Sequence, residues 1–234
     1  MNRLEITTPD GNFSAYIAKP EGASADKPAP GLLVIQEIFG VNKVMRDICD
    51  AYAAKGYVAV CPDIFWRQEP GVDITDQSKA EWDKAFELYQ GFDEAKGVED
   101  LIATVKTMRD HPVITDKIGS LGFCLGGKLA YLMATRSDAD CSVSYYGVGI
   151  DQALDEAANI TKPLLMHIAE KDGFVPPEAQ EKIKDTVGPI DKVTAYTYRG
   201  QDHAFARQGG DHYDKASADL ANDRTAEFLK ANLG

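Results

Sequence analysis

Gly122-Phe123-Cys124-Leu125-Gly126-Gly127 joins a predicted strand, Lys117–Phe123, to a predicted helix, Leu125–Thr135. In a Gly-x-Cys-x-Gly turn the middle residue is strained, and side chains at the flanking positions would collide with neighbouring backbone. The turn lifts the sulfur clear of the sheet and sets it at a helix N-terminus, which favours the thiolate. The pattern predicts Cys124 as a nucleophile. The simpler alternative is a glycine-rich turn with an incidental cysteine.

Apolar runs alternate with helical segments on both sides of this turn. The predicted strands are Arg3–Thr7, Ser14–Ala18, Gly31–Gln36, Tyr57–Cys61, Lys117–Phe123, Cys141–Tyr146, Leu164–Ala169 and Val193–Tyr198. The predicted helices are Asn42–Lys55, Asp76–Tyr89, Asp93–Asp110, Leu125–Thr135, Asp151–Ala158, Pro177–Thr186 and Tyr213–Ala231. This order predicts an α/β fold, with a mainly parallel central sheet, helices on both faces and an N-terminal antiparallel hairpin.

The 234 residues fit one domain, residues 1–234, because we find no linker, repeat or low-complexity tract. The formal net charge of −12 disfavours binding to nucleic acid or to an anionic membrane surface. Neither a signal peptide nor an apolar run long enough to span a bilayer is evident. We therefore expect a cytoplasmic monomer whose partner is a small molecule.

Four cysteines and four histidines are scattered along the chain. Cys49, Cys61 and Cys141 fall on predicted helix or strand positions, where a cysteine is usually a small buried hydrophobic residue. No close pair of cysteines suggests a metal site or a redox motif. Phosphate-binding and dinucleotide-binding motifs are also missing. We expect free thiols, no metal and no organic cofactor.

A base for Cys124 is expected in the loop after the last strand, where His203 lies. His212 is the rival, although it falls near the start of the final helix. His167 lies within a predicted strand, where a hydrogen-bonded core histidine is the simpler interpretation. His111 precedes Pro112 at the end of a helix and is expected to cap it.

The acid that orients this base should follow the preceding strand. Asp172 does so, and its role would be to hold the imidazole tautomer and stabilise the imidazolium. Glu170 is the alternative acid, and a plain Asp-Gly turn is the structural alternative for Asp172. Cys124, Asp172 and His203 thus form an ordered set, each residue after its own strand.

Over nearly its whole length the sequence resembles the dienelactone hydrolases (carboxymethylenebutenolidases), which have the α/β-hydrolase fold. The segments that carry the resemblance are Gln36–Asn42, Gly56–Asp63, the Cys124 turn, Tyr145–Gly149, the Asp172 loop and His203–Arg207. The resemblance implies an enzyme of aromatic degradation that opens dienelactone to maleylacetate through an acyl-enzyme on the cysteine.

The resemblance also implies further roles. Glu37 would lie near the thiol and control its proton, since a carboxylate opposes thiolate formation. The backbone N–H groups of Ile38 and Leu125 would form the oxyanion hole, and Arg207 would bind a substrate carboxylate. The structural alternatives are a loop-capping carboxylate for Glu37 and a surface charge for Arg207. The remaining implied substrate contacts are Phe39 and Tyr145.

One position departs from the family pattern. An ungapped match places Trp82 where the family has a second carboxylate-binding arginine, and neither Lys79 nor Lys84 would be a bidentate partner. An aromatic wall at Trp82 would stack on a conjugated lactone or admit a larger apolar ester. A carboxylesterase or lactonase for an uncharged substrate is therefore the second hypothesis. A catalytically silent small-molecule binding protein is the third.

Overall fold

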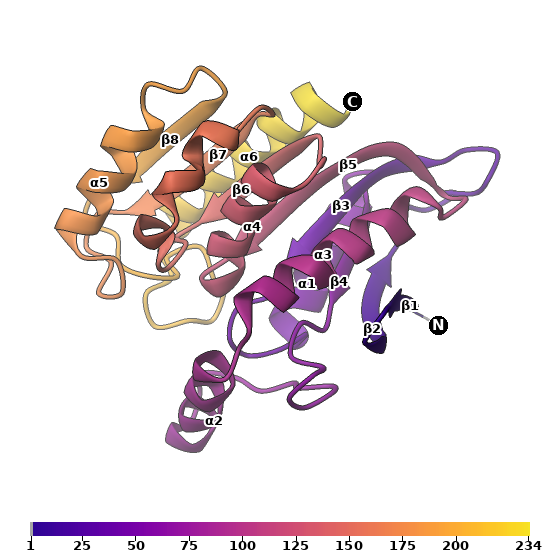
Figure 1. Cartoon of the computed structure of the whole chain (residues 1–234), viewed down its shortest axis with the longest axis horizontal. Helices are drawn as coiled ribbons and strands as arrows, with labels where there is room; N and C mark the ends of the chain where they lie inside the picture. Colours follow the sequence, from indigo (N-terminus) through magenta and orange to yellow (C-terminus); the bar gives the residue numbers. More distant parts are fainter. Residues whose placement is uncertain (1) are drawn as a thin grey trace. The chain divides into compact units, whose positions relative to one another are not determined.

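A computed structural model describes residues 2–234. Its helices and strands are drawn in Figure 1. Their bounds are β1 (Arg3–Thr8), β2 (Gly11–Ala18), β3 (Ala29–Ile35), α1 (Lys43–Ala54), β4 (Val58–Pro62), α2 (Lys79–Gln90), α3 (Glu94–Arg109), β5 (Ile114–Phe123), α4 (Leu125–Arg136), β6 (Cys141–Tyr145), η1 (Ile150–Gln152), η2 (Leu154–Asn159), β7 (Leu164–Ala169), α5 (Pro177–Val187), β8 (Val193–Tyr198) and α6 (Lys215–Leu233). Within residues 2–234, no helix is both long enough and apolar enough to cross a membrane.

Contacts along the chain group into two compact units, residues 1–118 and 119–234. Strand β5 belongs to both, because the boundary falls in its middle. The strands follow the order β1-β2-β4-β3-β5-β6-β7-β8. The expectation of one domain over residues 1–234 stays a prediction, and each unit is described by itself below.

In the first unit, β1 and β2 form the predicted antiparallel hairpin. Strand β2 then pairs antiparallel with β4, with Tyr16 opposite Cys61, a pairing that the sequence did not predict. Strand β3 runs parallel to β4, with Leu33 opposite Val60. All five residues of β4 are buried, which explains its unbroken apolar run.

In the second unit, β5, β6, β7 and β8 are parallel neighbours. The register sets Phe123 opposite Tyr145 and Ala169 opposite Tyr198. The strands therefore end at similar levels, and the loops that follow them meet at one edge of this unit's sheet. That edge is where α/β folds bind ligands.

The predicted elements agree with the structure in kind and closely in extent, with two corrections. The predicted helix Asp151–Ala158 is wrong, because this segment forms two 3₁₀ helices, η1 and η2. Ala153, between them, has φ −125° and ψ 20°, which no α-helix accommodates. Helix α2 begins at Lys79 rather than Asp76, because Ser78 caps it by accepting the N–H of Glu81.

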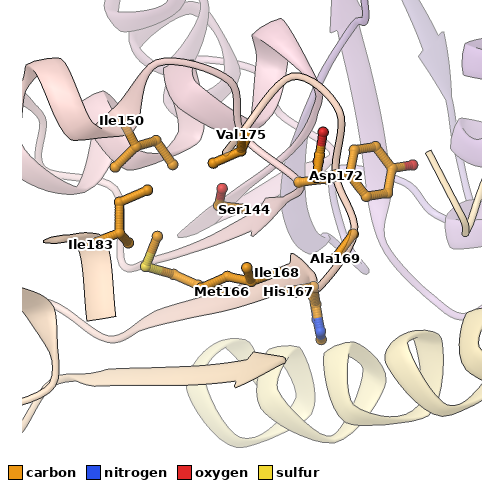
Figure 2. A pocket seen from close by; sticks show the side chains of 11 residues that line it. Ser144, Ile150, Met166, His167, Ile168, Ala169, Asp172, Val175 and Ile183 are labelled. Atoms are coloured by element: carbon orange, nitrogen blue, oxygen red, sulfur yellow. The ribbon is translucent and has the colours of Figure 1, made fainter. Parts of the chain in front are cut away.

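A buried polar chain fixes α6 to the sheet of the second unit. His167 on β7 is hydrogen-bonded through Nδ1 to the Tyr198 hydroxyl (2.7 Å) and through Nε2 to the Thr225 hydroxyl (2.9 Å). Burial, with repulsion from Arg224 as a lesser cause, lowers the pKa of His167 to about 3. Figure 2 shows this side chain extending from β7 toward α6. The prediction of a hydrogen-bonded core histidine is confirmed.

Candidate active site

Cys124 occupies a strained turn between β5 and α4. Its backbone has φ 56° and ψ −118°, and its N–H donates to the Tyr145 carbonyl at 3.1 Å. A Cβ added at Gly122 would lie 1.8 Å from the Gly126 carbonyl oxygen, and one at Gly127 would lie 2.4 Å from the Tyr145 carbonyl oxygen. The glycines are therefore steric requirements of this turn, as the sequence predicted.

Backbone strain gathers in the same region. Within residues 2–234, three non-glycine residues have positive φ: Cys124 (56°), Tyr146 (38°) and Ala204 (62°). Ala204 directly follows His203, and the Tyr146 ring packs edge-on against the His203 ring with centroids 5.1 Å apart. Such strain persists only where surrounding structure enforces it, and it clusters at functional sites.

His203 and Asp172 form a buried hydrogen-bonded pair. The imidazole Nδ1 lies 2.9 Å from Asp172 Oδ2 and 3.1 Å from Oδ1. Asp172 Oδ1 also accepts the backbone N–H of Phe174 at 2.9 Å, which fixes the carboxylate in its loop. The side chains are 8% and 1% exposed, so solvent screens this interaction very little.

Beside an ionised Cys124, the protonated form of His203 is strongly favoured. Burial would lower its pKa, but attraction to the Cys124 thiolate and hydrogen bonds to Asp172 and Cys124 raise the pKa to about 10. The imidazole of His203 therefore interacts with both Cys124 and Asp172. A thiolate next to an imidazolium is the pair expected of a nucleophilic cysteine and its base.

The N-terminus of α4 offers a hydrogen-bond donor next to this pair. Gly127 and Lys128 donate their N–H groups to the Cys124 carbonyl at 2.9 and 3.2 Å. Leu125 is the first residue of α4, so its N–H has no acceptor within the helix. The positive end of the helix dipole adds to the attraction for an anion at this point.

Four further predicted site residues lie in the first unit. Glu37 and Ile38 lie just beyond the end of β3, after Gln36, and are 4% and 5% exposed. Phe39 comes next, and its ring packs edge-on against Trp82 of α2 with centroids 5.0 Å apart. Trp82 Nε1 donates to the Asp76 carbonyl at 3.0 Å, which fixes the indole. Two predicted substrate contacts from separate segments, Phe39 and Trp82, are thus brought together.

Arg207 lies in the second unit, four residues after His203. Its backbone N–H donates to the Ala204 carbonyl at 2.9 Å, and its guanidinium runs over Gly210. A Cβ added at Gly210 would lie 2.9 Å from Arg207 Nε. The absence of a side chain at residue 210 therefore leaves room for the Arg207 side chain in its present position.

Tyr145, a predicted substrate contact, is fully buried. Its hydroxyl is hydrogen-bonded to Thr225 (2.6 Å) and to Asn222 (3.1 Å) of α6. We therefore leave it out of the proposed substrate site. Its neighbour Tyr146 contacts His203, as does the half-exposed Phe174, whose ring centroid lies 4.8 Å from the imidazole. The ring contact thus identifies Tyr146, rather than Tyr145, as the tyrosine beside His203.

The rival residues have other partners. Glu170 Oε2 accepts the Gly200 N–H at 2.7 Å, so Asp172 rather than Glu170 contacts His203. His212 Nδ1 donates to the His203 carbonyl at 3.0 Å, away from the thiol. His111 lies beyond the C-cap residue of α3, which is Asp110, so the prediction that it caps that helix is wrong.

The four cysteines, Cys49, Cys61, Cys124 and Cys141, are all free thiols, as predicted.

Behind Asp172 is a small cavity between β6, β7 and α5 (Figure 2). Its volume is about 10 Å³, and its walls are mostly apolar, including Ile150, Met166, Val175 and Ile183. Substrate pockets are usually some hundreds of Å³. This cavity therefore holds no substrate, and a substrate must approach Asp172 and His203 from elsewhere.

Comparison with known proteins places the chain in one family. The family model of the dienelactone hydrolase family matches residues 13–233. A "Putative carboxymethylenebutenolidase" of Azospirillum brasilense is 57% identical over 226 residues, 96% of each chain. The carboxymethylenebutenolidase of Pseudomonas putida is 37% identical over 227 residues, 97% of this chain and 94% of that protein. A crystal structure titled "Putative Dienelactone Hydrolase" from Klebsiella pneumoniae superposes with a TM-score of 0.85 at 25% identity, covering 97% of both chains.

Proposed function

This chain belongs to the dienelactone hydrolase family, and from that premise we propose that it opens a small lactone such as dienelactone to maleylacetate. The enzyme class, a carboxylic ester hydrolase, follows from the family. The observation that carries the proposed mechanism is that the buried imidazole of His203 is hydrogen-bonded to both Asp172 and Cys124. We expect it to act in the cytoplasm as a monomer without a cofactor.

Cys124 is the nucleophile in this mechanism. His203 holds the thiol proton, and the Cys124 sulfur attacks the lactone carbonyl, so that a C–S bond forms and the carbonyl becomes an oxyanion. The oxyanion collapses, the ring C–O bond breaks, and the leaving enolate takes the proton from His203. A water molecule, deprotonated by His203, then attacks the thioester and releases the acid and the thiol. Asp172 stabilises the imidazolium in both halves.

The oxyanion is stabilised by two backbone donors in the proposal. One is the Leu125 N–H at the start of α4, and the other is the Ile38 N–H after β3. Glu37 controls the proton of the resting thiol. The support for Ile38 and Glu37 is their position in the segment Gln36–Asn42, which carries part of the family resemblance.

The proposal is tested with a substrate panel. Dienelactone, a protoanemonin-type lactone and an activated aryl ester are each mixed with the protein, and product release is followed from the first turnover. We expect turnover of dienelactone and an initial burst of product from the aryl ester, equal to the enzyme concentration. Binding of all three without product would instead support a catalytically silent binding protein.

A second candidate function is a carboxylesterase or lactonase for an uncharged ester. The observation that favours it is the aromatic cluster at Trp82, which stacks on Phe86 (ring centroids 5.5 Å apart, planes at 28°) and meets Phe39 edge-on. Such a cluster binds flat apolar groups rather than carboxylates. Arg207 would then be the single cation for a substrate acid in the proposed site.

Trp82→Arg is expected to increase the preference for a carboxylated lactone over its methyl ester by about ten- to a hundredfold in kcat/KM. The physical reason is that a hydrogen bond from a charged donor contributes roughly 1.5–3 kcal/mol. The measurement is kcat/KM for the matched acid and ester in both proteins. Ala80→Arg, which adds the same charge at an exposed position of α2, is the control. An unchanged ratio in Trp82→Arg would show that residue 82 does not face the substrate.

Glu37→Gln is expected to speed alkylation of Cys124 at neutral pH in the absence of substrate. A nearby carboxylate disfavours the thiolate, and the neutral amide of glutamine removes that opposition while keeping the shape of the side chain. The measurement is the pH dependence of the rate with iodoacetamide. The control is Glu5→Gln, which makes the same change at an exposed position of the N-terminal hairpin. A change at the neighbouring residue Gln36 is less suitable, because Gln36 is buried and hydrogen-bonded. If the two variants react alike, Glu37 has no influence on the thiol.

A further inference from the structure

The loops that carry the acid and the base are joined side by side. They follow the neighbouring strands β7 and β8, whose pairing continues to Ala169 and Tyr198. Beyond the strands, Glu170 donates its N–H to the Tyr198 carbonyl (3.1 Å), and Lys171 donates to the Gln201 carbonyl (2.7 Å). These backbone bonds end just before the two functional side chains. Another interaction must therefore connect the two loops at Asp172 and His203.

Asp202 provides that connection. Its Oδ1 accepts the N–H of His203 at 2.7 Å and the N–H of Gly173 at 3.1 Å. His203 is the base itself, and Gly173 directly follows the acid Asp172. One carboxylate oxygen is therefore bound to the backbone on both sides of the acid–base contact. We propose that Asp202 is a positioning residue that holds Asp172 and His203 at bonding distance.

The charge of Asp202 suits this task. Burial opposes the charged form, but the N–H groups of His203 and Gly173, with the nearby His212 and His203 rings, outweigh it and lower the pKa of Asp202. The carboxylate is thus ionised at neutral pH and accepts both bonds at full strength. A second carboxylate also joins the two loops, because Glu170 accepts the N–H of Gly200. That bond lies farther from the acid–base contact.

His212 completes the surroundings of Asp202. Its Nδ1 donates to the His203 carbonyl at 3.0 Å, while its Nε2 lies 3.9 Å from Asp202 Oδ2. The two side chains are 50% and 41% exposed, so this ion pair contributes little in solvent. The two short bonds to backbone N–H groups therefore carry the positioning role of Asp202.

This inference rests on the proposed function, since it assumes that His203 is the base. The test compares Asp202→Ala, Asp202→Asn and the matched control Glu170→Ala. For each we measure kcat and KM on the best substrate of the panel. We also titrate His203 by NMR of ¹⁵N-histidine-labelled protein, assigned with His203→Gln. Urea unfolding verifies that each variant is folded, and Asp202→Ser repeats the truncation if Asp202→Ala is not.

In Asp202→Ala we expect kcat to fall about tenfold or more with KM within about twofold, because a small displacement of a catalytic pair is costly. We also expect a lower His203 pKa, because the hydrogen bond to Asp172 is loosened. Asp202→Asn should stay within about threefold of the parent kcat, since its amide oxygen accepts the same two N–H groups. Glu170→Ala should keep the parent kcat and His203 pKa.

Two results would overturn the inference. One is a parent-like kcat and His203 pKa in Asp202→Ala. The other is an equal loss in Asp202→Ala and Glu170→Ala, which would show only that the loops need any connection. If Cys124→Ala is fully active, the proposed function fails, and the NMR titration still decides whether Asp202 positions His203.

Discussion

Cys124→Ala is expected to lower kcat/KM for lactone hydrolysis by about 10⁴- to 10⁶-fold. Removal of a nucleophile that works with a base eliminates the covalent route and leaves only binding and oxyanion stabilisation. The stability of the fold should change little, because the partly exposed sulfur is not a core contact. The measurement is steady-state kinetics with enough enzyme to detect the residual rate.

The control for this prediction is Cys141→Ala in the same unit, at the start of β6. Cys141 is fully buried, so its loss should affect stability rather than turnover. One equivalent of iodoacetamide should label Cys124 first, since the other three cysteines are buried, and mass spectrometry of the peptides locates the label. Full activity of Cys124→Ala would end the proposal that this cysteine is the nucleophile.

His203→Ala and Asp172→Asn are each expected to lower kcat by about 10³- to 10⁴-fold, and the double variant by little more than either alone. The reason is that the three residues act as one unit, so the second loss removes nothing further once the first has disabled it. The amide of Asp172→Asn keeps the packing of this buried side chain but gives the imidazole the wrong partner. The measurement is kcat for all four members of the cycle.

The control for this cycle is His212→Ala, because His212 is hydrogen-bonded to the backbone carbonyl of His203 and pairs weakly with the half-exposed Asp202. It should lose far less activity than His203→Ala. Multiplicative losses in the double variant, of about 10⁶-fold or more, would indicate that His203 and Asp172 act independently. That result would contradict a shared imidazole between Asp172 and Cys124.

The sequence predicted the parallel strands with most accuracy. β7 and β8 have the predicted bounds. β7 is a short, mostly apolar run between turn residues, and β8 is rich in the β-branched and aromatic residues that favour strands. The strain at Cys124 was also predictable, since its flanking glycines have only one steric explanation. The antiparallel pairing of β2 with β4 was not, because a hairpin sequence does not specify which strand it joins.

The site was predictable in its chemistry and less so in its surroundings. The proposal of Cys124, Asp172 and His203 came from their places, each in the loop or turn after its own strand. Tyr145 and Tyr146 are adjacent, and successive side chains of a strand point to opposite faces, so the sequence alone does not indicate which of the two lies beside His203. Asp202 was also missed, because its role depends on a backbone N–H group, Gly173, that is far away in sequence.

Burial of His167 makes the stability of the folded state sensitive to acid. The pKa of His167 is lowered to about 3, so between the unfolded value of about 6.5 and pH 3 the unfolded chain binds a proton that the folded chain does not, and stability falls as the solution is acidified. The slope is about 1.4 kcal/mol per pH unit for one proton. The raised pKa of His203 adds no matching slope at alkaline pH, because the proton on the imidazole beside the Cys124 thiolate is one that the thiol carries in the unfolded chain. Urea titrations at several pH values below about 6.5 would trace the contribution of His167.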